Sequence, residues 1–283
     1  MFQRIAAFFL GVWQLLAGWL GIARLPIRNV VYAPQSQLQK MDITLPWKKG
    51  EADVILFIHG GGWAAGDKSG YKRQCRKYAS KGYAVATMNY RMIDLNLTPE
   101  QQTVNYVDML DDIDAAIAAL KCRMIEKGYA PRKLAITGGS AGGHLALLYG
   151  YSRGAKSAIP IAFLFSDVGP TDFTDPAYLD MPIQGALSIA AQLAGQADYD
   201  PRDISPLHYV TSSVPPTLLR HGGVDEIVPP SQGTRLKAAL DDADVRCDLF
   251  IYPNSGHGLE SKADAKISDQ YGVKLKEYFD MYF

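Results

Sequence analysis

Apolar residues in this chain fall into short continuous runs that alternate with longer segments of helical periodicity. Residues 54–58 form such a run, of the length expected for a strand that is buried on both faces of a sheet. The same reasoning predicts later strands, and it predicts two earlier strands joined by a Pro-containing turn. The earlier pair lies at 29–34 and 37–46, and the later strands lie at 83–90, 133–137, 159–165, 216–222 and 245–252.

The segments between these runs are amphipathic and predict helices. The longest spans 98–128, where Thr98 and Pro99 are typical of a helix start and Gly128 of a helix end. Strands that alternate with helices of this length indicate an α/β fold with a mostly parallel sheet and helices on both faces. Ligand sites in such sheets form at the carboxyl ends of the strands. The other helices are predicted at 71–82, 141–150, 231–243 and 265–282.

One stretch interrupts the alternation of strands and helices. Residues 169–215 are rich in Asp, Pro and Ala and contain one helix-like piece at 186–194. We expect this excursion to form a small cap over the site at the strand ends, not a second domain. The predicted organisation is therefore an N-terminal hydrophobic arm at 1–28, followed by one α/β domain at 29–283.

The N-terminal arm is the most apolar part of the chain. Residues 5–23 carry no charge and one polar side chain, Gln14, over a length close to the roughly 20 residues that span a bilayer. The arm could be a secretory signal that is removed, a membrane anchor, or a helix that docks on protein. Trp13 and Trp19 suit a membrane interface, so we favour an uncleaved helix that lies on a membrane or docks against a second subunit. This favours a membrane-associated or cytoplasmic protein, with export as the alternative.

Composition excludes several other classes of protein. The chain has 283 residues, is 48% hydrophobic and 20% charged, and has a formal net charge of zero, as in an ordinary globular protein. A neutral balance without a basic stripe argues against a nucleic-acid partner. The cysteines are odd in number and far apart, which predicts neither a disulfide framework nor a metal site, so we expect Cys75, Cys122 and Cys247 to be small half-buried apolar side chains.

A serine flanked by glycines stands where the strand at 133–137 meets the helix at 141–150. Gly138, Ser140 and Gly142 form the pattern G-x-S-x-G. A serine on a very sharp strand-to-helix turn has a strained backbone, and neighbouring side chains would collide with the turn or with the next strand. The glycines relieve this crowding and leave the serine hydroxyl exposed near a helix N-terminus. The pattern therefore predicts that Ser140 is a catalytic nucleophile, although a glycine-rich turn without chemistry would give the same residues.

Two other glycine-rich motifs do not fit this segment. A phosphate-binding loop requires Lys and then Ser or Thr after its last glycine, and here His144 and Leu145 follow Gly143. A dinucleotide-binding loop requires a glycine where Ser140 stands, or where Ala141 stands if the motif is shifted by one residue. We therefore predict neither nucleotide site.

A second glycine-rich loop follows the strand at 54–58. Its sequence is HGGGW, at residues 59–63. An ester under attack by serine develops negative charge on its carbonyl oxygen, and backbone N–H groups aimed at that oxygen stabilise it by roughly 3 kcal/mol each. We expect the donors of this oxyanion hole to be the N–H groups of Gly61, Gly62 and Ala141. His59 is expected to hold the loop by hydrogen bonds instead of acting as a base.

Two later loops supply candidates for the acid and the base. Asp225 follows the strand at 216–222 and is expected to orient an imidazole; Glu226 and Asp172 are the alternative acids. His257 lies in a glycine-flanked loop after the last strand, from which an imidazole could reach Ser140. The other histidines are less suitable as the base, because His144 lies in the helix after the serine, His208 in the excursion and His221 in the end of a strand.

These motifs resemble those of the α/β-hydrolase superfamily, from about residue 29 to the end of the chain. More narrowly, HGGGWAAGDK, NYR, GGSAGGHLA and HGGVDEIVP resemble the carboxylesterases related to hormone-sensitive lipase and to bacterial acetyl-xylan and feruloyl esterases. The chain order Ser140, Asp225, His257 is also that of this architecture. The hormone-sensitive-lipase group usually has an acidic residue before the serine, where this chain has Gly139, so the resemblance favours the acetyl-esterase branch.

The resemblance implies a serine carboxylesterase that acts on small-molecule esters with short acyl chains, without a metal or an organic cofactor. Kynurenine formamidases share much of the pattern, so an amidase, formamidase or peptidase that uses the same three residues is the alternative. An inactive hydrolase fold used for binding or scaffolding is a third hypothesis, which the presence of all three side chains disfavours. The possible partners besides the ester are a membrane surface or a second copy of the chain, through the arm.

Overall fold

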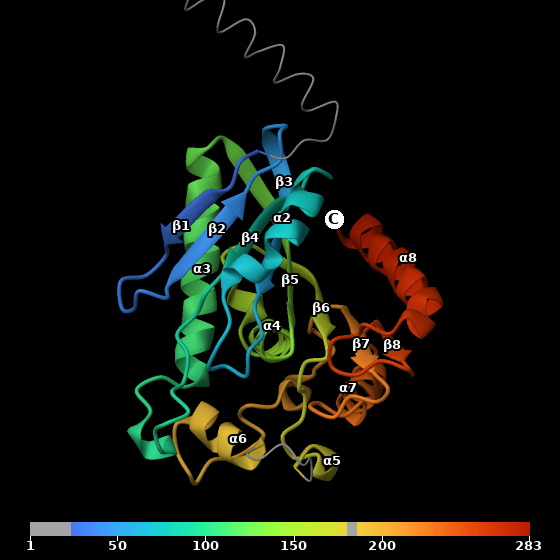
Figure 1. The fold of residues 1–283 in the computed structure, drawn as a ribbon. Coiled ribbons are helices and arrows are strands. Elements are labelled where there is room, and N and C mark those ends of the chain that lie inside the picture. Colours follow the sequence, from blue (N-terminus) through green and yellow to red (C-terminus); the bar gives the residue numbers. More distant parts are fainter. Residues whose placement is uncertain (1–23, 180–185) are drawn as a thin grey trace, which may run out of the picture.

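The computed structural model describes residues 24–179 and 186–283, which form a sheet of eight strands between layers of helices (Figure 1). The strand order is β1-β2-β4-β3-β5-β6-β7-β8. β2 pairs antiparallel with β1 and β4, and every other pairing is parallel. The strands are β1 (Ile27–Val31), β2 (Lys40–Thr44), β3 (Gly50–Ile58), β4 (Ala84–Met88), β5 (Tyr129–Gly139), β6 (Ile161–Asp167), β7 (Thr217–Gly222) and β8 (Cys247–Tyr252).

Helices cover both faces of this sheet, as the alternating pattern predicts. Alternate residues of β3 point to opposite faces, so that Leu56 belongs to one hydrophobic core cluster and Phe57 to the other. The first cluster includes side chains of α3 (Tyr106–Glu126), α4 (Ala141–Ser152) and α7 (Ser231–Asp242), and the second includes side chains of α2 (Lys72–Ala79) and α8 (Ala265–Tyr282). The predicted α/β fold with a mostly parallel sheet is therefore confirmed.

The long helix predicted at 98–128 is shorter than expected. Pro99 begins a single 3-10 turn that ends at Gln101, and α3 begins only at Tyr106. Asn105 caps α3: its side chain accepts from the N–H of Val107 at 2.8 Å, while Asp108 accepts from the N–H of Asn105 at 2.9 Å. This capping box is a stronger helix start than the Thr-Pro pair, whose own box closes only the short turn.

The excursion at 169–215 contains one more helix than the sequence predicted. Besides α6 (Ala186–Ala194), which matches the predicted helix-like piece, it contains the short α5 (Pro176–Leu179) and a 3-10 turn at Pro206–Tyr209. Asp175 starts α5, because its side chain accepts from the N–H of Ala177 at 3.1 Å. In Figure 1 both α5 and α6 lie at the end of the molecule opposite the first described residues.

The predicted N-terminal hydrophobic helix lies almost entirely outside the described residues. Arg24 is the first described residue, and β1 begins at Ile27, one residue before the predicted end of the arm at 28. Residues 24–179 and 186–283 include no helix that is long and apolar enough to cross a membrane.

The three cysteines differ in their environments. Cys75 and Cys247 are buried, but Cys122, on α3, is exposed, so the expectation of a half-buried apolar side chain was wrong for Cys122. The amphipathic α3 turns one side to solvent, and Cys122 lies on that side.

Candidate active site

Ser140 lies on a sharp turn between the end of β5 and the first residue of α4. Its φ is 54° and its ψ is −125°. A positive φ in a residue with a side chain costs about 1–3 kcal/mol and persists only where the surroundings impose it. Here they do: the N–H of Ser140 donates to the carbonyl of Asp167 at 2.8 Å, and the carbonyl of Ser140 accepts from the N–H of His144 at 3.0 Å. Hydrogen bonds to Asp167 at the end of β6 and to His144 in α4 therefore hold the strained turn.

The two flanking glycines make this turn sterically possible. A Cβ atom on Gly138 would lie 2.4 Å from the backbone of Gly142 and from the carbonyl oxygen of Ile58. A Cβ atom on Gly142 would lie 2.1 Å from the same oxygen. Both distances are far below a van der Waals contact, so β3, β5 and α4 can approach this closely only with glycine at 138 and 142.

The HGGGW loop lies beside this turn. Gly61 and Gly62 have φ values of 119° and 60°, which favour glycine. The carbonyl of Gly61 accepts from the N–H of Ala65 at 2.9 Å. Because the C=O and N–H of a trans peptide point in opposite directions, the N–H of Gly62 points away from that turn. Ala141 is the first residue of α4, so its N–H has no partner within the helix.

A buried histidine connects this loop to the nucleophile helix. The indole N–H of Trp63 donates to Nδ1 of His144 at 3.1 Å, and Nε2 of His144 lies 2.7 Å from the carbonyl oxygen of Ile204. Burial lowers the pKa of His144 to about 4, so the ring is neutral near pH 7 and carries its proton on Nε2. The sequence analysis set His144 aside as a base without finding these partners. Its hydrogen bonds join the HGGGW loop, α4 and the excursion.

His59 contacts its own loop and its neighbours on the sheet. Its Nδ1 lies 2.8 Å from the carbonyl oxygen of Gly60, and its ring stacks on Tyr90 with 4.5 Å between centroids. Burial lowers the pKa of His59, which makes the neutral ring with a proton on Nδ1 the donor to Gly60. These contacts are those of a residue that shapes the loop.

Asp225 and His257 form a close pair. Oδ2 of Asp225 lies 2.8 Å from Nδ1 of His257, and the Asp225 side chain is fully buried. Its other oxygen accepts from the N–H groups of Ile227 at 2.9 Å and Val228 at 3.0 Å. Burial by itself would raise the pKa of Asp225, but the hydrogen bonds from His257, Val228 and Ile227 outweigh it and lower the pKa. The carboxylate is therefore charged and directed at one nitrogen of the imidazole.

The two alternative acids lie elsewhere. Asp172 accepts from the N–H of Thr174 at 2.8 Å and from Nε of Arg235 at 2.8 Å, so its carboxylate is already paired. Glu226 is exposed to solvent. The structure brings His257 together with Asp225 and with neither alternative.

The two remaining histidines make other contacts. Nε2 of His221 lies 3.2 Å from the carbonyl oxygen of Val228, and burial lowers the pKa of His221 to about 4. Nε2 of His208 lies 3.7 Å from Oδ1 of Asp172, which is already paired with Arg235.

The loop that carries His257 is held by a residue that the sequence analysis did not single out. Asp264 is buried and accepts three hydrogen bonds from this loop: from the N–H of Asn254 at 3.1 Å, from Nδ2 of Asn254 at 2.9 Å, and from Oγ of Ser255 at 2.6 Å. Asp264 ends the short 3-10 turn at Lys262–Asp264 and belongs to no recognisable motif. Its role depends on its contacts with the loop, which the sequence alone does not reveal.

Ser140 and His257 line one cavity of about 350 Å³. The excursion forms part of its wall, and most of the side chains that line it are apolar. Among the described residues, the Ser140 hydroxyl makes no hydrogen bond to His257 in this structure, although both side chains face the same space; such contacts are often long in enzymes without substrate. The lining residues are Gly61, Gly62, Trp63, Ser140, Pro170, Tyr178, Ile189, Ile227, Val228 and His257.

Over residues 24–179 and 186–283, no group of three or more His, Cys, Asp or Glu side chains is arranged to hold a metal ion.

Two curated relatives are similar in sequence to this chain. The probable carboxylic ester hydrolase LipM of Mycobacterium tuberculosis is 27% identical over 225 residues, which are 72% of this chain and 49% of LipM. Acylamino-acid-releasing enzyme 1 of Oryza sativa subsp. japonica is 25% identical over 91% of this chain and 34% of its own length. The chain thus spans half or less of each of these two relatives.

A solved structure and a family match agree with the fold. Butyrate-bound Est2, an esterase of Thermogutta terrifontis, superposes with a TM-score of 0.68 at 22% identity, over 89% of this chain and 93% of Est2. The BD-FAE family matches residues 41–240, which include most of β2, all of β3 to β7 and most of α7. The chain adopts the α/β-hydrolase fold and belongs to the BD-FAE family.

Proposed function

We propose that this protein is a serine carboxylesterase. The observation that carries the proposal is that Ser140, on a strained turn, and His257, oriented by the buried carboxylate of Asp225, line the same cavity. A nucleophile, a base and a group that orients the base are the minimum for acyl transfer through a covalent intermediate.

The proposed reaction has two halves. In the first, Oγ of Ser140 bonds to the acyl carbon while Nε2 of His257 takes the hydroxyl proton, and His257 then gives that proton to the leaving alcohol as the C–O bond breaks. In the second, a water molecule gives a proton to His257 as its oxygen bonds to the acyl carbon. His257 then returns that proton to Oγ of Ser140 as the bond between Oγ and the acyl carbon breaks, which releases the acid. Asp225 stabilises the charged imidazole in both halves. The N–H groups of Gly61, Gly62 and Ala141 are the proposed donors to the oxyanion.

The test of the nucleophile is Ser140→Ala. We expect esterase activity to fall by about 10⁴-fold or more, with an unchanged thermal unfolding temperature or a slight increase as backbone strain is relieved. A fluorophosphonate probe should label the wild-type chain at Ser140 only. The matched control is Ser213→Ala, an exposed serine of the excursion, which should keep full activity and labelling. An active Ser140→Ala variant, or labelling at another serine, rules out the proposed nucleophile.

We further propose that short acyl chains are preferred. The cavity of about 350 Å³ is near the lower end of ligand pockets, and Tyr178 and Ile189 of the excursion narrow it. The butyrate bound to Est2 supports the same preference, because that neighbour has the same fold. Activity on p-nitrophenyl esters should peak between acetate and butyrate, and Tyr178→Ala should move the peak to longer chains. A peak on palmitate would contradict this proposal and leave the nucleophile assignment standing.

Cleavage of an amide by the same residues is the second candidate function. It is supported by the similarity to acylamino-acid-releasing enzyme 1, which extends over 91% of this chain. Comparing kcat/KM for p-nitrophenyl acetate with that for aryl amides and N-formyl aryl amines separates the two functions. A higher value for any of the amides would favour an amidase, formamidase or peptidase over an esterase.

A further inference from the structure

We propose that the protein contacts an anionic membrane surface through basic side chains at the end of the sheet opposite the catalytic cavity. The described chain enters the fold at residues 24–28, directly after the uncharged apolar residues 5–23. Two separate pockets flank this short segment, one lined by residues 24, 25 and 27 and the other by residues 26 and 28. Cationic side chains line both.

The first pocket is an apolar groove of about 390 Å³ with three cations in its lining. Leu25 is 90% exposed here. The guanidinium of Arg24 lies 4.8 Å from the centre of the Trp47 ring and donates to the Trp47 carbonyl at 3.1 Å. A tryptophan beside a cation and exposed apolar side chains is typical of surfaces at a membrane interface. The groove is lined by Arg24, Leu25, Ile27, Leu45, Trp47, Lys49, Lys127 and Tyr129.

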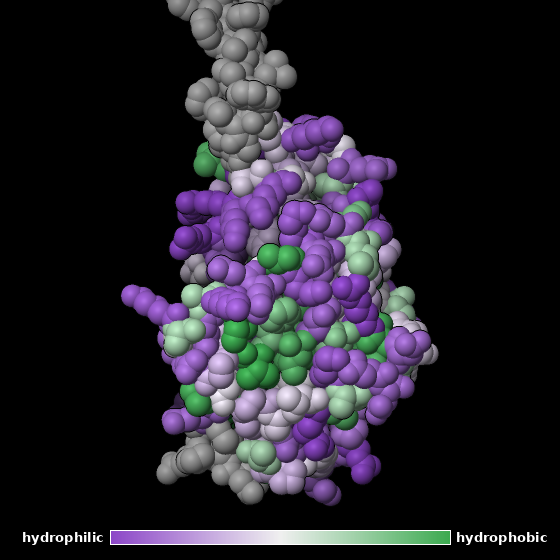
Figure 2. Space-filling model, turned by 90° about the vertical axis from the view of Figure 1, so that its right-hand side faces the viewer, coloured by the Kyte–Doolittle hydropathy of each residue, from purple (hydrophilic) through white to green (hydrophobic). Residues whose placement is uncertain are grey.

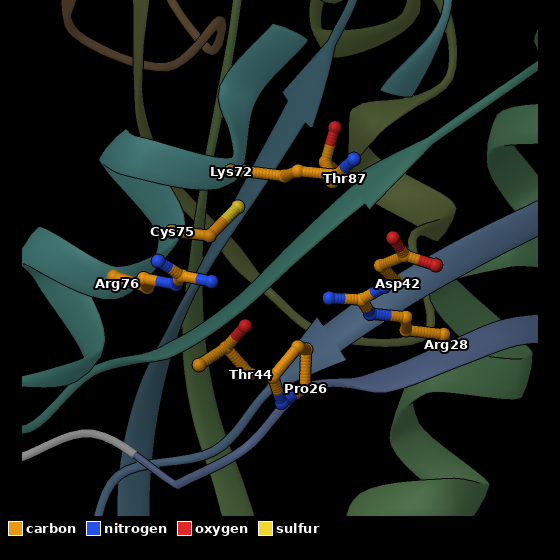
Figure 3. Close-up of a pocket in the computed structure, with 8 residues that line it drawn as sticks. All are labelled: Pro26, Arg28, Asp42, Thr44, Lys72, Cys75, Arg76 and Thr87. Atoms are coloured by element: carbon orange, nitrogen blue, oxygen red, sulfur yellow. The ribbon is translucent and has the colours of Figure 1, made fainter. Parts of the chain in front are cut away.

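The second pocket lies between α2 and strands β1, β2 and β4 (Figure 3). Lys72 and Arg76 extend from α2, and Arg28 extends from β1 on the other side. It is narrow, with a volume of about 20 Å³, so it holds no organic ligand. The carboxylate in its wall, Asp42, already pairs with Lys68 at 2.8 Å. The charge of the three lining cations is therefore not cancelled by Asp42.

The cations of both pockets are available to an external partner. Within residues 24–179 and 186–283, five of them form no ion pair: Arg28, Lys49, Lys72, Arg76 and Lys127. All five are exposed. The exposed carboxylates near Lys49 and Lys127 are those of Glu51 and Glu126, which lie next to Arg132 and Arg123. The five unpaired cations therefore leave a local excess of positive charge around one entry point. On the face that Figure 2 shows, most of the coloured surface in the upper part of the molecule is hydrophilic. Anionic lipid head groups neutralise such a surface.

The topology places Lys49 and Lys127 far from the catalytic residues, whereas Lys72 directly follows Tyr71, whose hydroxyl lies beside Gly139. Gly50 and Tyr129 pair where β3 and β5 begin, next to Lys49 and Lys127, whereas Ser140 follows the last residue of β5. In Figure 1 the chain enters at the top, and α5 and α6, whose residues line the cavity, lie at the bottom. The inferred orientation therefore leaves the catalytic cavity on the side of the molecule away from the membrane, where it receives esters from water.

A second copy of the chain is the alternative partner for this surface. Two copies meeting through this surface would bring unpaired cations against each other, and like charges brought together in an interface cost free energy. An anionic bilayer has an apolar interior and a negatively charged surface, which match the apolar groove and the cations that line it.

The experiment is co-flotation of the full chain with lipid vesicles. Wild-type protein should partition more strongly to vesicles of phosphatidylcholine with phosphatidylglycerol than to vesicles of phosphatidylcholine alone. The triple variant Lys49→Gln, Arg76→Gln, Lys127→Gln should lose about a hundredfold in partition to the anionic vesicles, since each basic residue near an anionic surface is worth about fivefold. Its partition to neutral vesicles should be unchanged.

The matched control removes three exposed cations at the opposite end: Arg202→Gln, Lys262→Gln, Lys266→Gln. We expect it to bind anionic vesicles within about threefold of wild type. The inference is overturned if wild type partitions equally to both vesicle types, or if both triple variants lose equally. It is also overturned if the protein binds no vesicles and the first triple variant changes its sedimentation, an outcome that would point to a second copy of the chain. Ser140→Ala should float like wild type, so this result is independent of the proposed function.

Discussion

Two buried aspartates follow neighbouring parallel strands of this sheet, and only one of them meets a histidine that lines the cavity. Asp172 comes after β6 and Asp225 after β7, and both side chains are fully buried. Asp225 pairs with His257 at 2.8 Å, whereas Asp172 pairs with Arg235 and Thr174. The comparison shows that residue type, burial and position after a strand do not distinguish the aspartate that pairs with His257 from the one that pairs with Arg235. The two aspartates differ in the side chains they contact, and this difference is the basis on which Asp225 is proposed as the catalytic acid.

Among the variants that test this comparison, the largest effect is expected from Asp225→Asn. The amide preserves the size of the side chain but neither stabilises a charged imidazole nor holds the required tautomer of His257, so kcat should fall by about 10³–10⁴-fold. Steady-state kinetics on p-nitrophenyl acetate measure this. If Asp172→Asn lost as much activity and Asp225→Asn did not, the roles of the two aspartates would be reversed.

A smaller effect is expected from Asp264→Ala, which acts through the loop of His257. The loop loses three hydrogen bonds, so kcat should fall by about 10–100-fold with little change in KM, and fluorophosphonate labelling of Ser140 should slow in parallel. Asp53→Asn is the matched control: Asp53 is nearly buried and pairs with Arg132 at the other end of the sheet.

Both variants are expected to unfold at lower temperature than wild type. Only Asp264→Ala should slow the reaction of Ser140. A loss of kcat in Asp53→Asn as large as that in Asp264→Ala would mean that general destabilisation, not the position of the loop, explains the effect.

Asp172→Asn should affect stability more than catalysis. Its carboxylate accepts from Thr174 and Arg235, and weakening buried hydrogen bonds to a charged group costs about 1–3 kcal/mol of unfolding free energy. Activity at 25 °C should remain within about threefold of wild type. Urea denaturation with parallel kinetics tests this expectation, and an unchanged midpoint would show that the Arg235 pair contributes nothing measurable.

The smallest effect concerns acid stability, where the two aspartates should behave alike. Burial would raise the pKa of each, but hydrogen bonds from His257 to Asp225, and from Thr174 and Arg235 to Asp172, lower both pKa values below that of an unfolded aspartate, about 3.9. Each carboxylate therefore contributes stability that is present above about pH 4 and is lost as the pH falls through the folded pKa.

Unfolding temperatures measured from pH 6 down to pH 3 should accordingly fall less steeply in Asp225→Asn and in Asp172→Asn than in wild type. Curves that run parallel to the wild-type curve would show that neither carboxylate is linked to acid unfolding.

The order of strands and helices was predictable from the sequence because burial on both faces of a parallel sheet produces apolar runs of a characteristic length. The start of α3 was not, since Thr98-Pro99 and Asn105 are both plausible helix starts, and the reciprocal hydrogen bonds of Asn105 and Asp108 decided between them. The additional helix α5 was missed for a related reason: four residues are too few to show helical periodicity.

The sequence by itself determined the turn at Ser140, because the turn requires glycine at positions only two residues away on either side. Only glycine tolerates the approach of Ile58 to positions 138 and 142, so the short motif G-x-S-x-G is enough to recognise the turn. The tertiary structure decided which carboxylate faces His257, how His144 links the HGGGW loop to Ile204, and that Asp264 holds the loop after β8. These partners are 9 to 81 positions apart in the chain. Sheet order and loop closure bring them together, and no short segment of sequence encodes that geometry.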